Sequence, residues 1–173
     1  MTATRLVVFL VCVATPLFAV PPTESGLADH YHTSHFSDAS LQKLFADVLE
    51  PVKSVRELPP AIVAQLGKIA GEENLQLAEP GAAYNATDAI LDPKLPYRQL
   101  RFAGKVGSFF LICYDRGGSR SSECAVIFAL DSQGRPNPIW AAVVLARCNT
   151  LAELRDAYTR HNVVEYPLAF GIF

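Results

Sequence analysis

Apolar side chains recur at helical intervals in two segments of the first half of the chain. In residues 38–52 they fall at the i, i+3 and i+4 positions of one helix face, and Ser37 or Asp38 is placed to cap the first turn. A weaker stripe follows Pro59-Pro60, and Gly71 is placed to end it as a C-cap. The apolar positions of the two stripes are Leu41, Leu44, Phe45, Val48, Leu49 and Val52, then Ile62, Val63, Leu66 and Ile69.

After a proline-containing stretch at residues 78–96, which is predicted to be a long loop, the pattern becomes typical of β-strands. Apolar residues alternate with polar ones around Leu100 and Phe102, and later segments are rich in β-branched and aromatic side chains. Gly104-Lys105 is a predicted turn. The later segments are 106–114, 123–130 and 139–145, with a turn at 131–134 and a last possible strand in 163–173.

A third helix is predicted after the strands. Thr150 and Glu153 have the spacing of a capping box, and Leu151, Leu154 and Tyr158 follow on one face. The sequence therefore predicts an α+β fold: an antiparallel β-meander of about five strands, with two N-terminal helices and one C-terminal helix packed on it.

The first nineteen residues have the pattern of a secretory signal peptide. A basic start at Arg5 precedes an apolar run at 6–14, and Pro16 then interrupts the run before the small residue Ala19. A membrane-spanning helix needs ~20 apolar residues, so this run is too short for one. We expect residues 1–19 to be cleaved near Ala19, 20–36 to be a flexible lead-in, and 37–173 to form one periplasmic domain without a membrane contact.

The composition is that of an ordinary globular protein with no excess of basic residues. The 15 Lys and Arg against 17 Asp and Glu give a net charge of −2. A nucleic-acid-binding surface is strongly basic, so no nucleic-acid partner is expected. Half of the residues are hydrophobic, which is enough for a core that needs no metal.

The cysteines suggest a disulfide in the second hairpin. Cys113, Cys124 and Cys148 remain after cleavage, and an oxidising compartment favours pairing of two of them. If Gly118-Ser119 is a two-residue type II′ turn, Cys113 lies directly opposite Cys124. Apolar pairs also match in this register: Leu111/Val126, Phe109/Phe128, Ile112/Ala125 and Phe110/Ile127. A Cys113–Cys124 bond with Cys148 free is predicted; three unpaired thiols, or a bond to Cys148, are the alternatives.

Between these two cysteines the chain becomes polar, with no hydrophobic residue in 115–123. We interpret this stretch as a polar finger on a stiff apolar stem, because a preorganised tip loses little conformational freedom when it binds. Its hydroxyl and guanidinium groups suit a polar active-site cleft; an ordinary solvated hairpin end is the alternative. The predicted partner-binding residues are Arg116, Gly117, Gly118, Ser119, Arg120, Ser121 and Ser122.

Other candidate chemistry is weaker. His30, His32 and His35 could hold a metal ion, but they lie in the lead-in without a supporting scaffold, so no metal site is predicted. Cys148 and His161 could form a thiol nucleophile and its base, but no small-residue elbow surrounds the cysteine, which is expected to be a packed thiol. No catalytic residue and no cofactor are therefore predicted.

Three further positions are interpreted as structural. Asn85 begins an Asn-Ala-Thr glycosylation tripeptide, which arises easily by chance. Trp140 is expected in the core or on the sheet, and Gln99 and Arg101 are expected on the solvated face of their strand.

The signal peptide, the domain size and a Gly/Ser-rich hairpin on an antiparallel sheet resemble the periplasmic immunity proteins that neutralise peptidoglycan-cleaving amidase effectors of type VI secretion. Residues 1–19 and the stretch from Cys113 to Cys124 carry this resemblance. It implies that loops plug the cleft of a cysteine amidase. Ser119, Ser121 and Ser122 would then contact the cleft, and Gly117 and Gly118 would allow close approach.

The expected function is therefore that of a periplasmic immunity or inhibitor protein whose partner is a secreted cell-wall amidase. An inhibitor of lysozyme or of a protease would use the same hairpin. A secreted thiol hydrolase would instead require an accessible Cys148 of low pKa, acting with His161.

Overall fold

A computed structural model describes residues 38–90, 92–118 and 121–166. The predicted signal peptide (1–19), the lead-in (20–36) with His30, His32 and His35, and the hairpin residues Ser119 and Arg120 lie outside the described residues. In chain order the elements are α1 (Asp38–Ala46), β1 (Glu50–Val52), the 3-10 helix η3 (Val55–Glu57), α2 (Pro60–Ala70), β2 (Arg98–Val106), β3 (Phe109–Arg116), β4 (Ser122–Leu130), β5 (Pro136–Val144), α3 (Leu151–Thr159) and β6 (Val163–Glu165).

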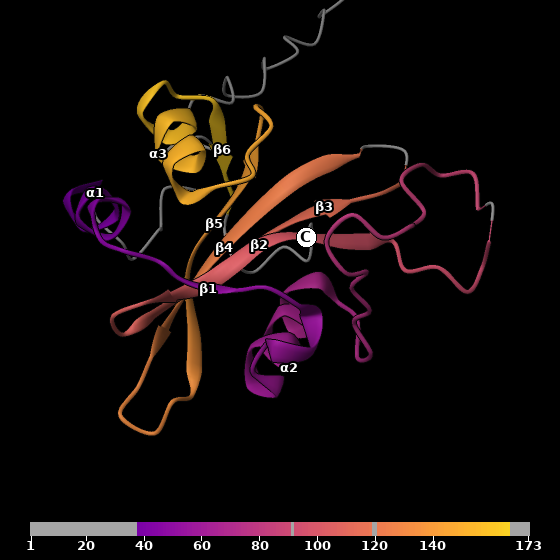
Figure 1. The fold of residues 1–173 in the computed structure, drawn as a ribbon, viewed down its shortest axis with the longest axis horizontal. Coiled ribbons are helices and arrows are strands. Elements are labelled where there is room, and N and C mark those ends of the chain that lie inside the picture. The colour runs from indigo at the N-terminus through magenta and orange to yellow at the C-terminus, as the bar shows by residue number, and fades with distance from the viewer. Residues whose placement is uncertain (1–37, 91, 119–120, 167–173) are drawn as a thin grey trace, which may run out of the picture.

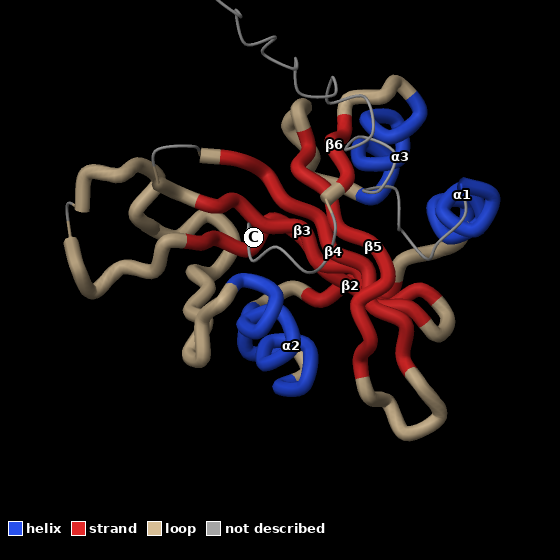
Figure 2. The backbone as a smooth tube through the Cα atoms, turned by 180° about the vertical axis from the view of Figure 1, so that it is seen from behind, coloured by secondary structure: helices blue, strands red, loops and turns tan. Residues whose placement is uncertain are grey.

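The described strands form one antiparallel sheet in the order β1-β2-β3-β4-β5-β6, so each strand pairs with its neighbours in sequence. Helices α1 and α3 lie on one side of this sheet and α2 lies on the other (Figure 1), as the view from behind also shows (Figure 2). The predicted α+β meander is confirmed, with six strands where about five were expected.

Each face of the sheet has its own hydrophobic cluster. Leu41 and Phe45 of α1 and Leu154 of α3 pack with one cluster, and Ile62 and Leu66 of α2 pack with the other. The central strands β3 and β4 contribute to both clusters, so they are buried on both faces. Trp140 is fully buried in the α1–α3 cluster, within the predicted core.

Helix α1 ends at Ala46, earlier than the periodicity predicts. Val48 is exposed, and residues 50–52 form the strand β1 on β2. Pro51 explains the difference, because its ring cannot continue a helix but is tolerated on an edge strand. The apolar residues in 38–52 therefore belong to a helix and to a strand, and the strand was not expected from the sequence.

Helix α2 begins and ends as expected, and α3 begins as expected. Helix α2 starts at Pro60 and ends at Gly71, which adopts the left-handed conformation (φ 71°). At the start of α3, the Thr150 hydroxyl accepts from the Glu153 N–H at 3.2 Å, and the Glu153 carboxylate accepts from the Asn149 N–H. The first bond satisfies a donor that the first helical turn leaves free, and the second ties the residue before the cap to that turn.

The turn between β2 and β3 is at Gly107-Ser108, so the predicted turn at Gly104-Lys105 is wrong. Gly107 has φ 57°, which suits the first position of a two-residue hairpin loop. Gly104 lies inside β2, where a Cβ would overlap the Glu50 carbonyl oxygen. Its lack of a side chain lets β1 approach β2.

The register of β3 and β4 differs by one residue from the predicted one. Cys113 lies opposite Ala125, and Cys124 lies opposite Tyr114. Neighbouring strand positions point to opposite faces, so Cys113 packs in the α1–α3 cluster and Cys124 in the α2 cluster. The predicted Cys113–Cys124 disulfide is therefore contradicted: Cys113, Cys124 and Cys148 are buried free thiols in the structure.

Within the described ranges, no helix combines the length and the apolar character that a membrane span requires.

Candidate functional site

The β3–β4 connection is longer than the predicted two-residue turn at Gly118-Ser119, and its first residue packs against the rest of the domain. Arg116 pairs with Ser122 in the ladder, so the connection between β3 and β4 is residues 117–121. The Gly117 N–H donates to the Tyr97 carbonyl oxygen at 2.7 Å. A Cβ on Gly117 would overlap the Asn85 carbonyl oxygen, so this glycine allows close approach to the chain's own loop. Gly117 is therefore buried against the domain and not presented to a partner.

The loop that supports the hairpin end is organised by Asn85, which is 3% exposed. Its side-chain amide donates to the carbonyl oxygens of Asp92 (2.8 Å) and Leu95 (2.9 Å), and its backbone N–H donates to Pro96 (2.9 Å). The long loop is thus fixed from within. Because the Asn85 amide is buried and bonded, the folded domain does not present it for glycosylation.

An open recess of about 450 Å³ lies beside the hairpin end. We call it the hairpin recess. It is bordered by the ends of β3 and β4 and by residues 143–147, with Tyr84 from the long loop. Its polar lining consists of Tyr84, Asp115, Arg116, Ser121, Ser122, Glu123 and Arg147. Three predicted partner-binding residues, Arg116, Ser121 and Ser122, line this recess. Gly118, whose φ is 105°, does not line the recess.

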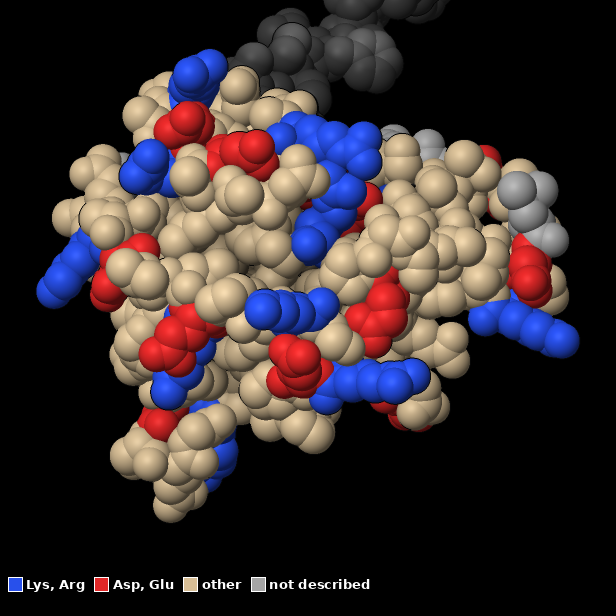
Figure 3. Space-filling model, in the orientation of Figure 1, with Lys and Arg blue, Asp and Glu red and all other residues tan. Residues whose placement is uncertain are grey.

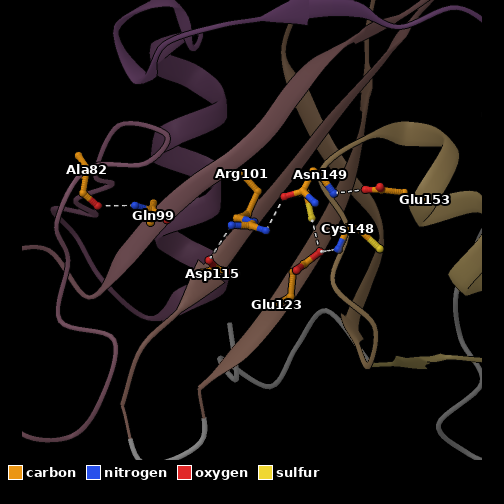
Figure 4. Close-up of polar contacts among 9 residues, drawn as sticks. Ala82, Gln99, Arg101, Asp115, Glu123, Cys148, Asn149 and Glu153 are labelled. Atoms are coloured by element: carbon orange, nitrogen blue, oxygen red, sulfur yellow. Dashed lines mark hydrogen bonds and ion pairs between the residues drawn. The ribbon is translucent and has the colours of Figure 1, made fainter.

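Arg101 is brought to this end of the sheet by a β-bulge. Leu100 pairs with Tyr114 and Phe102 with Cys113, so Arg101 is the extra residue between them. Its guanidinium lies 3.5 Å from the Asp115 carboxylate and donates to the Asn149 side-chain oxygen at 2.5 Å. Bulges re-aim side chains in this way and are frequent next to functional sites. Figure 4 shows these contacts.

Arg101 and Gln99 were expected on a solvated strand face, and the structure contradicts this. Arg101 has a side chain only 10% exposed, and Gln99 is buried and donates to the Ala82 carbonyl oxygen. Neither position could be predicted from a local motif, because the bulge at Arg101 is set by the pairing with β3 and Gln99 bonds to Ala82 of the long loop.

Glu123 is a second residue that sequence reasoning missed as a site residue. One of its carboxylate oxygens accepts from the Cys148 N–H at 2.8 Å and from the Cys113 thiol at 3.6 Å (Figure 4). Burial raises the pKa of Glu123, and the bonds from Cys148 and Cys113 oppose this rise. The carboxyl is thus fixed at the back of the recess.

Glu123 lies directly opposite Asp115 in the β3–β4 ladder, and two like charges in such a pair repel one another. Arg101 offsets the charge of Asp115, and the Cys148 N–H offsets that of Glu123. Tyr84 is close enough that burial and the negative charge of Asp115 raise its pKa.

The two arginines that line the recess are less constrained. Among the described residues, neither Arg116 nor Arg147 has a carboxylate within ion-pair distance. Arg147 is exposed and Arg116 half-buried. On the face drawn in Figure 3, basic side chains gather beside a hollow above the centre, with acidic side chains at its border.

The requirements of a thiol enzyme are not met at Cys148. Its side chain is fully buried, and burial with the nearby Glu123 carboxylate raises its pKa to about 12. A nucleophilic cysteine needs access and a lowered pKa. His161 is exposed after α3 with φ 56° and lines a different surface depression, with Tyr158 and Glu165. Across the described part of the chain, no three His, Cys, Asp or Glu side chains are arranged to hold a metal ion.

Comparison with known proteins gave no relative: no protein-family model, no curated protein and no solved structure matches this chain.

Proposed function

We propose that this protein is an exported inhibitor that binds a secreted cell-wall enzyme through the end of its β3–β4 hairpin. By its resemblance to periplasmic immunity proteins, the enzyme is a peptidoglycan amidase of type VI secretion. The observation that carries the proposal is the hairpin recess, where Arg116, Ser121 and Ser122 meet Tyr84 and Arg147 at an open, polar surface.

The contact surface in this proposal is broader than a single finger. The disulfide brace is absent, but Gly117 is held by the Tyr97 carbonyl oxygen and by the loop around Asn85. This support preorganises the hairpin end, which lowers the entropy cost of binding. The hairpin end and residues 145–147 together would cover the rim of a partner's cleft.

The proposal is tested by measuring amidase activity on peptidoglycan at increasing ratios of this protein to a purified peptidoglycan amidase effector of type VI secretion. Inhibition that is complete near a one-to-one ratio is expected. Lysozyme is assayed in parallel. Inhibition of lysozyme alone would mean that the protein is a lysozyme inhibitor and that the amidase is not its partner. No inhibition of either enzyme would overturn the proposal.

A matched pair of variants tests the surface. Ser121 and Gln133 are both exposed and lie just beyond the opposite ends of β4. Ser121→Trp adds bulk at the recess and should relieve inhibition, whereas Gln133→Trp should leave it unchanged. Both variants should keep the circular dichroism and melting of the parent. Equal inhibition by the two variants would place the contact elsewhere.

A further inference from the structure

The charges around the hairpin recess are unevenly compensated. Asp115 has Arg101 at 3.5 Å, and Glu123 is 8% exposed and accepts the Cys148 N–H. The two carboxylates of the lining are therefore already engaged by the domain. Arg116 and Arg147 have no such partner among the described residues.

The side chains that remain available are suited to an anion. Arginine presents planar N–H donors that match a carboxylate or phosphate in a two-point contact. The exposed Ser121 hydroxyl adds a neutral donor to the same lining, whereas the Ser122 hydroxyl contacts the Cys124 thiol and the Tyr84 hydroxyl bonds to Asp115. A volume of about 450 Å³ is enough for one or two side chains of a partner, and lies at the small end of ligand sites.

The charge of the whole molecule argues against a polyanion as the occupant. A net charge of −2 and a pI near 6.1 repel nucleic acid at long range, so only a local anion is favoured. Around the recess, three positively charged side chains face two carboxylates, so one further carboxylate would balance the local charge. The positive side chains are Arg101, Arg116 and Arg147, and the carboxylates are those of Asp115 and Glu123.

We propose that the hairpin recess binds an exposed acidic side chain of the partner protein, with Arg147 as its principal contact and Arg116 supporting it. This inference rests on the proposed function for the existence of a protein partner. It adds the chemistry by which that partner is recognised: the partner presents an Asp or Glu to this surface.

The test uses the full-length protein and short peptides, so that it does not depend on any enzyme assay. Nuclear magnetic resonance follows the Arg147 side-chain N–H and the Ser121 amide during titration with N-acetyl-Asp-Glu-amide. N-acetyl-Asn-Gln-amide is the neutral control, and inorganic phosphate is a second probe. Saturable shifts of both signals with the acidic peptide alone are expected.

Arg147→Gln should lower the affinity of the protein for the acidic peptide by about tenfold or more. Lys105 is an exposed charged residue at the other end of β2, and Lys105→Gln should leave the affinity of the protein for the acidic peptide unchanged. Because Arg147 is exposed, its variant should keep the amide spectrum of the folded protein away from the recess.

Three results would overturn the inference: equal shifts with the neutral peptide, equal weakening by Lys105→Gln, or phosphate binding more than about tenfold tighter than the acidic peptide. The last would identify a free phosphate as the ligand. A protein that binds the acidic peptide but inhibits no enzyme would retain the recess chemistry and lose the inhibitor function, so the two proposals fail separately.

Discussion

Two residues, Gly117 and Asn85, fix the hairpin end on the domain. A side chain on Gly117 would meet the backbone of Asn85, which cannot yield as a flexible side chain would. Asn85 in turn ties the loop together through two carbonyl oxygens. The geometry of the recess therefore depends on one missing Cβ and one buried amide.

Gly117→Ala tests this close approach. The added methyl group forces the hairpin and the loop apart, and overpacking of this kind costs about 1–3 kcal/mol of unfolding free energy. Ser121→Ala, at an exposed position of the same connection, should change stability by less than about 0.5 kcal/mol. Urea unfolding of both variants measures the difference; a Gly117→Ala protein as stable as the parent would contradict the contact.

Glu123 makes stability depend on pH in a defined direction. Burial raises its pKa in the folded state above the ordinary value of 4.5, so the folded protein holds this proton more tightly than the unfolded chain. This tighter proton binding stabilises the folded protein. The resulting contribution to the free energy of unfolding is fully present below pH 4.5 and is lost as the pH rises through the folded-state pKa of Glu123.

In Glu123→Gln the Cys148 N–H keeps an acceptor, but the titration is removed. The variant should therefore gain stability relative to the parent as the pH rises from 4 to 8, measured by urea unfolding at each pH. A difference that does not vary with pH, or that moves the opposite way, would show that the pKa of Glu123 is not raised.

At the scale of the elements, the sequence predicted the order of the helices and strands except for β1, but it did not predict the register of the central hairpin. β4 is apolar on both faces from Cys124 to Phe128, because α2 covers one face and α1 with α3 the other. Without alternation, apolar pairs match in either of two registers one residue apart. In β2 the regular alternation around Leu100 and Phe102 gave no sign of the bulge at Arg101, whose place is set by the pairing of β2 with β3.

The register predicts how the thiols react. Cys113, Cys124 and Cys148 are buried, and burial raises the pKa of each, so native protein should be alkylated slowly by iodoacetamide at pH 8. After unfolding in guanidinium chloride all three should react at once, as followed by mass spectrometry of their separate peptides. A cysteine placed at exposed Ser132 is the control for fast labelling.

Two outcomes of that labelling would contradict the structure. Rapid native labelling of Cys148 would mean that the thiol is accessible. A cross-linked peptide containing both Cys113 and Cys124 would mean that the two lie on the same face of the hairpin, as the sequence alone predicted.

At the scale of the whole molecule, helices cover both faces of the sheet (Figure 1). The polar recess lies at one end of the central strands β3 and β4. The polar stretch 115–123 lies at this end of the hairpin, although Gly117 and Glu123 within it are buried. Tyr84 and Arg147 could not be predicted, since they reach the recess from segments distant in sequence.

The most direct test of the inhibitor surface is hydrogen exchange of this protein alone and in complex with the amidase. The account predicts slower exchange on binding in residues 116–122 and 143–147 and around Tyr84, with no change in the turn at 131–134. Protection confined to other surfaces while the amidase is inhibited would contradict the assignment of the hairpin recess as the binding site.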